Sequence, residues 1–311
     1  MSKTKKAVII GSVLVGIGVI IGFIGIAIGG FKFPNGAVDL TTMKALHAEK
    51  KTVQIADAFD KIEIAGASSM DIEICKSKTG KNYVEYYDTD DWTSHVDVKE
   101  HVLKFTTDDK GKHKAVVSLG FGKDTAARLY LADAEYKEIS VTTLSGYVTI
   151  QDVNAETVNV SASSGDLYMK NINVPDSIMA TSSSGDIDLE NATAKQIELG
   201  ANSGDIEMQD ITAESLRMST SSGDIDLADA TAKQMELKAS SGDIDLERCD
   251  AEGFDITTSS GDVDMEITAG RTYRFETKTN SGAVDVPDGD ADSDYLCKIV
   301  TSSGDVDVKQ K

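Results

Sequence analysis

A short phrase, Ser-Gly followed by alternating acidic and apolar residues, recurs down the C-terminal half of this chain. Successive glycines of the phrase are separated by 19, 20, 19, 19, 19, 19, 21 and 22 residues. So regular a period is typical of repeat architectures, in which each unit buries its apolar face only against its neighbours. The repeat therefore decides the fold class. The glycines are Gly146, Gly165, Gly185, Gly204, Gly223, Gly242, Gly261, Gly282 and Gly304.

Apolar residues occupy fixed positions after each glycine. After Gly223 they are Ile225, Leu227, Ala230, Ala232, Met235, Leu237 and Ala239. Steps of two are the pleat of a strand with one face buried, and the steps of three between groups indicate corners. Coils of this kind, stacked about 4.8 Å apart, form an all-β parallel β-solenoid, or β-helix. We expect about nine coils of 19–22 residues, with the Ser-Gly glycine in the left-handed region at the tightest corner.

The region before the repeats is less regular. Residues 32–57 are expected to form a juxtamembrane stalk with a short helix over 40–51. Residues 70–74 alternate apolar and acidic side chains after two serines, like a degenerate copy of the repeat phrase. Because a repeat stack needs an end that covers its open strand edges, we expect an irregular β cap over 58–140 before the solenoid of 141–311.

Residues 7–31 contain no charged side chain. At 1.5 Å per helical residue this span exceeds the roughly 30 Å of a hydrocarbon core. Three lysines precede it and Lys32 alone follows closely, which predicts that residues 1–6 lie in the cytoplasm. A cleaved signal peptide is the competing interpretation, but the apolar run is longer than a typical one. The sequence therefore predicts a single-pass protein of the cell membrane, held in the lipid bilayer by a transmembrane signal-anchor helix, with its C-terminal domain extracytoplasmic.

The formal net charge of -21 belongs to the repeats. Residues 141–311 hold 12 Lys and Arg against 33 Asp and Glu, whereas residues 1–140 hold 19 of each kind. An acidic surface of this kind repels nucleic-acid phosphates, so the composition excludes nucleic-acid binding as the main role.

The first and third residues after each glycine are acidic in coil after coil. The pairs are Asp186/Asp188, Asp205/Glu207, Asp224/Asp226, Asp243/Asp245, Asp262/Asp264 and Asp305/Asp307. Carboxylates stacked about 5 Å apart repel one another by roughly 1 kcal/mol per pair even in water. Two arrangements offset this repulsion: a solvated ladder whose carboxylates accept turn hydrogen bonds, and bound calcium ions.

An acidic insertion lengthens the coil after Gly282. Its alternate aspartates form the candidate metal site, with weakly bound calcium as the ion: Asp288, Asp290, Asp292 and Asp294. The glycine and glutamate of a helix-loop-helix calcium loop are absent, because Ser293 and Ile299 hold those positions. The other interpretation is an exposed acidic loop. No other cofactor is expected.

Other candidate sites are weaker. His95 and Asp97 would share one strand face, with His101 nearby, but no third metal ligand is placed. The three cysteines are far apart, so they predict neither a disulfide framework nor a zinc site. Cys249 falls in an otherwise apolar column and is expected to be a small buried hydrophobe. The repeats contain neither a histidine nor a Gly-x-Ser-x-Gly motif, which argues against a hydrolase triad.

The serial Ser-Gly-Asp-Ile/Val-Asp-Leu units resemble a known bacterial family, the "toast-rack" putative adhesins, whose function is not known. The resemblance covers residues 58–311 and includes the Phe-x-x-Ile-x-Ile opening at 59–64 and the segment 128–146. The chain departs from the pattern at Leu131-Ala132-Asp133, where such proteins tend to carry a Leu-Pro turn. The resemblance implies a membrane-tethered extracytoplasmic domain, in some cases tied to envelope stress, with no established catalytic residues.

We therefore expect a non-catalytic, adhesin-like or envelope-stress interaction scaffold. Its partner would be another envelope or membrane protein or a cell-surface component, which the extended faces of a solenoid suit better than a pocket does. Two alternatives remain open: a β-helix carbohydrate-active enzyme of the cell envelope, and a calcium-dependent adhesion module.

Overall fold

The computed structural model describes residues 37–39, 44–45, 48–67, 70–89, 92–109, 116–118 and 126–311. The membrane span predicted over 7–31 lies outside these residues. Among the described residues, no helix is both long enough and apolar enough to cross a bilayer. The chain divides into two compact units. The smaller contains an antiparallel three-stranded sheet of β1 (Ala37–Asp39), β2 (Lys44–Ala45) and β9 (Val116–Ser118).

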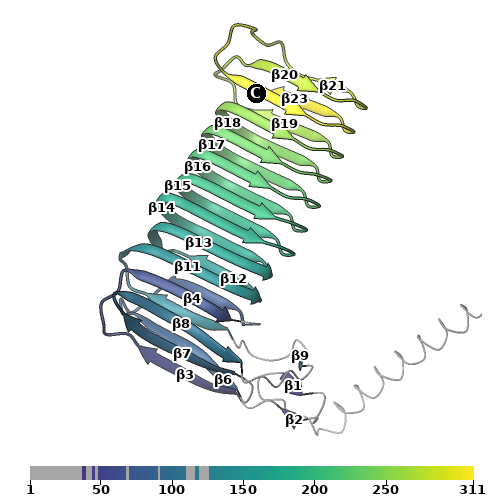
Figure 1. Cartoon of the computed structure of the whole chain (residues 1–311). Coiled ribbons are helices and arrows are strands. Elements are labelled where there is room, and N and C mark those ends of the chain that lie inside the picture. Colours follow the sequence, from purple (N-terminus) through teal and green to yellow (C-terminus); the bar gives the residue numbers. More distant parts are fainter. Residues whose placement is uncertain are drawn as a thin grey trace, which may run out of the picture. The chain divides into compact units, whose positions relative to one another are not determined.

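The larger unit, residues 49–111 and 125–311, is built on a 20-stranded sheet that winds into a solenoid. Its repeats stack as successive rungs (Figure 1). The strands before the repeats are β3 (Ala48–Gln54), β4 (Lys61–Ala67), β5 (Ile72–Lys76), β6 (Tyr83–Thr89), β7 (Trp92–Lys99), β8 (Val102–Asp109) and β10 (Ala127–Leu131). The repeat strands are β11 (Glu135–Ser145), β12 (Val148–Gln151), β13 (Asn154–Ser164), β14 (Leu167–Ser182), β15 (Ile187–Ala201), β16 (Ile206–Ser219), β17 (Ile225–Lys238), β18 (Ile244–Thr257), β19 (Val263–Ile267), β20 (Arg274–Lys278), β21 (Val284–Asp285), β22 (Leu296–Val300) and β23 (Val306–Gln310).

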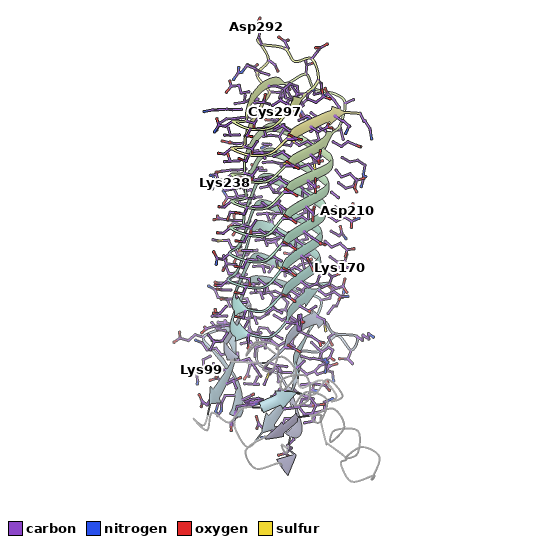
Figure 2. The ribbon with its side chains drawn as sticks, turned by 90° about the vertical axis from the view of Figure 1, so that its right-hand side faces the viewer. Lys99, Lys170, Asp210, Lys238, Asp292 and Cys297 are labelled. Carbon is purple, nitrogen blue, oxygen red and sulfur yellow. The ribbon has the colours of Figure 1, made fainter. Side chains whose placement is uncertain are left out.

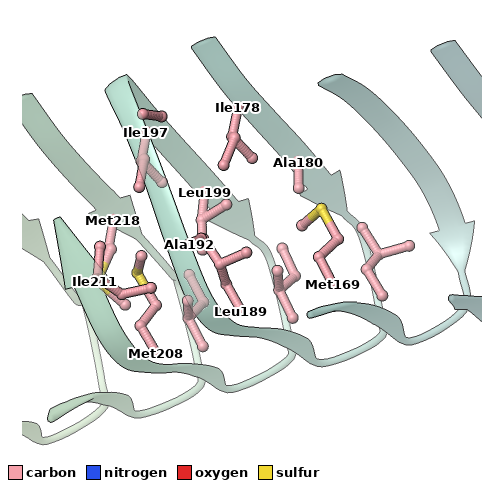
Figure 3. Close-up of a cluster of buried hydrophobic side chains, with 14 of the residues drawn as sticks. Met169, Ile178, Ala180, Leu189, Ala192, Ile197, Leu199, Met208, Ile211 and Met218 are labelled. Atoms are coloured by element: carbon pink, nitrogen blue, oxygen red, sulfur yellow. The ribbon is translucent and has the colours of Figure 1, made fainter. Parts of the chain in front are cut away.

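Neighbouring repeats pair in parallel with a shift of one period, which confirms the predicted β-solenoid. Ile187 lies opposite Ile206, and Leu189 lies opposite Met208. The inward side chains of successive coils therefore form apolar columns. Figure 3 shows side chains from opposite walls of the coil, such as Met169 and Ala180, filling the interior between the ribbons. Both are fully buried.

The reason for glycine at the Ser-Gly corner differs from the one expected. Among these glycines only Gly146 has a left-handed φ, at 117°. At the others, a Cβ atom would overlap the carbonyl oxygen of the glycine one coil before, as for Gly223 above Gly204. The column thus requires glycine because successive backbones approach so closely, and the predicted left-handed φ was wrong for all but Gly146.

Left-handed residues occur instead six positions after each glycine, at the corner between the first two inward groups. Their φ values lie between 52° and 57° in six successive coils. Asn and Asp tolerate this region better than most residues do, which accounts for five of the six. The residues are Asp152, Asn171, Asn191, Asp210, Asp229 and Arg248.

The N-terminal end of the solenoid contains the predicted degenerate repeat. β5 pairs in parallel with β12, so that Ile72 lies opposite Val148. Met70 takes the place of a glycine in the corner column, because a Cβ at Gly146 would lie 2.5 Å from the Met70 carbonyl oxygen. Antiparallel strands follow, with β6 against β10 and β7 against β8. The helix expected over 40–51 is wrong where the structure describes it, since β2 and β3 lie there.

The C-terminal end departs from the expectation that every coil lies on its predecessor. β22 lies between β18 and β20, and β23 lies between β19 and β21. The last coil of the chain is therefore inserted before the one that precedes it in sequence.

Candidate functional site

An acidic groove of about 720 Å³ runs along one wall of the solenoid. It crosses β14 to β19 and reaches β23, and the third residue after the corner glycine faces it in the coils from Gly165 to Gly261. Strand alternation places these side chains: in β15, Ile187 and Leu189 point inward, so Asp188 between them points outward. The groove residues in this column are Tyr168, Asp188, Glu207, Asp226, Asp245 and Asp264.

The groove carboxylates are partly desolvated and lie beside one another. Burial first, and then the carboxylates of Glu207, Asp186 and Asp166, raise the pKa of Asp188 to about 6. Burial is also the main cause of the raised pKa of Asp226 and of Asp245. The groove is therefore a row of carboxylates held close together at some electrostatic cost.

Lys309 is the basic residue among those that line the groove, and Lys170, Arg248 and Lys311, which are not lining residues, pair with the lining carboxylates of Glu190, Glu247 and Glu266. At one end, hydrogen bonds from Lys170 Nζ at 2.6 Å and Tyr168 Oη at 3.0 Å lower the pKa of Glu190. At the other end, Lys309 lies 3.1 Å from Asp307. Between these ends the lining residues are acidic or uncharged, so the groove favours cationic groups.

The first residue after the glycine has a different role in the coils where it is Asp. Its Oδ1 accepts a hydrogen bond from the backbone N–H of the equivalent residue one coil further along, over 2.7–3.0 Å. The turn-capping ladder that the sequence predicted therefore exists in this column. Its members are Asp166, Asp186, Asp205, Asp224, Asp243, Asp262 and Asp305.

The two acidic columns looked equivalent in the sequence analysis, and the difference between them was missed. A signal was present: the first column is Asp in all seven of these coils, whereas the third accepts Glu207 and Tyr168. In this column the Asp side chain places its Oδ1 within hydrogen-bond distance of the next amide. The tolerance of the third column for other side chains is typical of an exposed groove.

Buried hydroxyls form a second missed column, three residues before the corner glycine. Ser182 Oγ donates to the carbonyl oxygen of Gly165 at 3.1 Å and accepts from the N–H of Gly185 at 3.0 Å. Thr220 makes the same pair of bonds with Gly204 and Gly223. These hydroxyls fasten the corner of one coil to the next.

The predicted calcium ligands lie in an exposed loop at the C-terminal end of the solenoid, where Figure 2 labels Asp292 at the tip. Asp290 Oδ1 accepts the N–H of Asp292 at 2.9 Å, and Ser293 Oγ accepts the N–H of Tyr295 at 3.0 Å. Within the described residues, no three His, Cys, Asp or Glu side chains are grouped to hold a metal ion. Calcium at Asp288, Asp290, Asp292 and Asp294 stays a prediction without a convergent ligand set.

The histidine cluster considered in the sequence is not brought together. His95 Nε2 lies 3.1 Å from Asp108, whereas Asp97 pairs with Lys99. His101 lies in the turn between β7 and β8 with a left-handed φ of 62°. Cys249 is fully buried, as expected, and burial raises its pKa to about 12.

Comparison with solved structures shows the same fold. The crystal structure of a putative lipid binding protein from Parabacteroides distasonis is 18% identical to this chain. Its TM-score is 0.50, over 85% of this chain and 97% of that one. A putative adhesin from Bacteroides fragilis is 16% identical, with a TM-score of 0.45 over 85% of this chain and 97% of that one. A search among curated proteins finds no match.

The family comparison covers most of the chain. The family model described as Toastrack DUF4097 matches residues 59–309. This range begins at the Phe-x-x-Ile-x-Ile opening and includes every Ser-Gly corner. The chain therefore belongs to the Toastrack DUF4097 family.

Proposed function

We propose that this chain is a single-pass membrane protein that presents its solenoid outside the cell as a non-catalytic, adhesin-like or envelope-stress interaction scaffold. Residues 7–31 would hold it in the bilayer, with residues 1–6 in the cytoplasm. The observation that carries the proposal is the acidic groove, which extends over successive rigid coils and offers a long charged surface.

The partner fits the charge of this surface. A row of partly desolvated carboxylates attracts cationic groups and accelerates their encounter, and salt weakens that attraction. We infer an envelope or membrane protein, or another cell-surface component, that carries positive charge along an extended face. Nucleic acid is excluded by the same charge.

The binding test compares two variants of the full chain, each of which loses three negative charges. Asp226→Asn, Asp245→Asn and Asp264→Asn together neutralise the groove. Their matched control neutralises as many exposed carboxylates away from it, at Glu156, Glu198 and Glu252, each replaced by Gln. Retention of the protein on isolated cell envelopes should fall for the groove variant and persist for the control. Equal retention of the two variants contradicts a role for the groove.

Membrane tethering is tested separately. A tag after residue 311 should fractionate with the membrane and be removed by protease added to intact cells from which any outer layer has been stripped. A tag found in the soluble fraction, or protected from protease until the membrane is broken, contradicts the proposed topology.

The alternative is a carbohydrate-active enzyme of the cell envelope. The pKa of Asp188, near 6, lies in the range of a general acid. A glycosidase needs two carboxyl groups whose pKa values are pushed apart, and the groove contains such carboxyls, because the pKa of Glu190 is lowered whereas those of Asp188, Asp226 and Asp245 are raised. The Glu190 carboxylate, however, already accepts hydrogen bonds from Lys170 and Tyr168. Glycan cleavage by the purified protein that Asp188→Asn abolishes would establish the enzyme and overturn the scaffold.

A further inference from the structure

The last coil of the chain is held on both sides like an inserted strand. β22 pairs in parallel with β18 on one side and with β20 on the other. β23 pairs in the same way with β19 and β21. In Figure 1 the yellow β23 lies between β19 and β21.

The inserted coil carries the corner column and the carboxylate ladder across this junction. Gly304 lies on the carbonyl oxygen of Gly261, and Gly282 lies on that of Gly304. The N–H of Asp305 donates to Asp262 Oδ1 at 2.7 Å, and Asp305 Oδ1 accepts the N–H of Ala283 at 2.7 Å. The segment therefore occupies a slot between the strands β18 and β19 on one side and β20 and β21 on the other, and it makes specific contacts with both sides.

The outermost coil depends on that segment. Among the described strands, β20 and β21 pair only with β22 and β23. Without the segment, the outer coil would have no strand partner, and the solenoid would end at β18 and β19. The segment's inward side chains, such as Cys297, Ile299 and Val306, are at most 1% exposed.

A separate loop, residues 286–295, connects the outer coil to the inserted segment. It is mostly exposed and contains the acidic insertion with its four aspartates. Its anchoring hydrogen bonds join it to the start of the outer coil: the N–H of Asp290 donates to the Tyr273 carbonyl at 3.0 Å, and Ser293 Oγ donates to that of Thr272 at 2.6 Å. These bonds, unlike the pairing in the slot, depend on the loop turning back within one chain.

We propose that two copies of this chain exchange residues 296–311, each copy inserting its C-terminal segment into the slot of the other. The strand pairs, the ladder bonds and the buried columns are the same whether the segment comes from the same chain or from a second copy. Exchange of an identical element is therefore a low-cost route to a dimer. The protein concentration and the length of the loop 286–295 decide the ratio of exchanged dimer to monomer. This inference is independent of the proposed function.

A second copy suits the slot better than an unrelated peptide does. The slot needs glycine against the Gly261 carbonyl, an acceptor at the position of Asp305, and a basic partner for Asp255. Lys298 meets the last requirement, with its Nζ 3.0 Å from Asp255 Oδ1. These requirements match the chain's own sequence.

The test places two cysteines on separate copies of the full chain, both lacking Cys75. One copy carries Asp255→Cys and the other Lys298→Cys, at positions that lie opposite each other in register. The two are mixed, unfolded, refolded together at high concentration and oxidised. Exchange predicts a disulfide-linked species of twice the chain mass. The control replaces the Lys298→Cys copy with Glu198→Cys, an exposed site on β15, and should give only background linkage. Equal linkage in the two mixtures overturns the proposal.

The unsubstituted chain provides a readout that does not depend on the variants folding. After refolding, light scattering should find a doubled mass whose share rises with protein concentration. A single-chain mass at every concentration also overturns the proposal. Deletion of residues 289–292 should increase the dimer share, because the shortened loop cannot return within its own chain, whereas a Gly-Ser replacement of equal length should not.

Discussion

Asp224 Oδ1 accepts a hydrogen bond from the backbone N–H of Asp243, one coil further along the solenoid, at 2.8 Å. The same bond recurs from coil to coil, so each carboxylate satisfies an amide that its neighbour would otherwise leave unpaired at the corner. Stacking carboxylates in this column thus stabilises the corners despite their mutual repulsion.

Asp224→Ala should lower the free energy of unfolding by about 1 kcal/mol, because it leaves the Asp243 amide without its acceptor. Asp224→Asn keeps an acceptor oxygen and removes a charge, so its effect should be smaller. Urea unfolding measures both. Asp288→Ala, in the exposed loop, is the control and should be neutral. A loss for Asp288→Ala as large as for Asp224→Ala contradicts the role given to the ladder.

Acidification from pH 7 to pH 5 should increase the free energy of unfolding. The pKa of Asp188 is raised to about 6 in the folded protein, from an ordinary value of 3.8. The folded state therefore binds protons that the unfolded state does not bind in this window, so stability rises as pH falls. Further acidification should reverse the trend, because hydrogen bonds from basic side chains lower the pKa of carboxyls such as Asp229 and Glu236.

Asp188→Asn isolates the groove contribution to this pH dependence. The variant should be more stable than the parent at pH 7 and should show a shallower rise toward pH 5, as measured by thermal melts across the range. A variant whose melts follow the parent at every pH would mean that the Asp188 carboxyl does not titrate in this window.

Cysteine labelling should follow burial. Cys249 and Cys297 are fully buried, and burial raises the pKa of each to about 12. Cys75 is only partly buried. An alkylating reagent should therefore modify Cys75 first in the native protein and reach the other two only on unfolding, as mass spectrometry of peptides would show. Rapid native labelling of Cys249 would place it outside the core.

Salt should stabilise the solenoid without specificity for calcium. Its repeats carry the whole formal charge of -21, and mobile ions screen the repulsion between exposed carboxylates. Melting temperature should rise equally with sodium and calcium salts at matched ionic strength, and chelation should leave it unchanged. A selective calcium shift that Asp290→Asn and Asp292→Asn together remove would establish the loop site instead.

The repeat unit could be predicted from sequence because strand periodicity acts locally. The alternation around Ile225 and Leu227 specifies which side chains turn inward, and the constant period specifies the register between coils. Residues 70–74 were recognisable as a repeat for the same reason, although Met70 replaces the glycine.

The errors arose where different causes select the same residue. A left-handed φ and a close backbone approach both require glycine, so the corner column alone did not distinguish them. The order of the last two coils depends on which of two similar repeat phrases, the one at Gly282 or the one at Gly304, stacks directly on the coil of Gly261. Ala283 stands where Asp305 has its ladder carboxylate, and this difference marks the outer coil.

The stacking of successive corner glycines is tested most directly by the unfolding free energies of two variants, Gly223→Ala and Gly200→Ala. A methyl group at Gly223 would overlap the Gly204 carbonyl, whereas one at Gly200 would have its nearest neighbour at 3.6 Å. Gly223→Ala should cost at least about 2 kcal/mol, and Gly200→Ala should be neutral or slightly stabilising. Equal stability of the two variants would contradict the stacked solenoid.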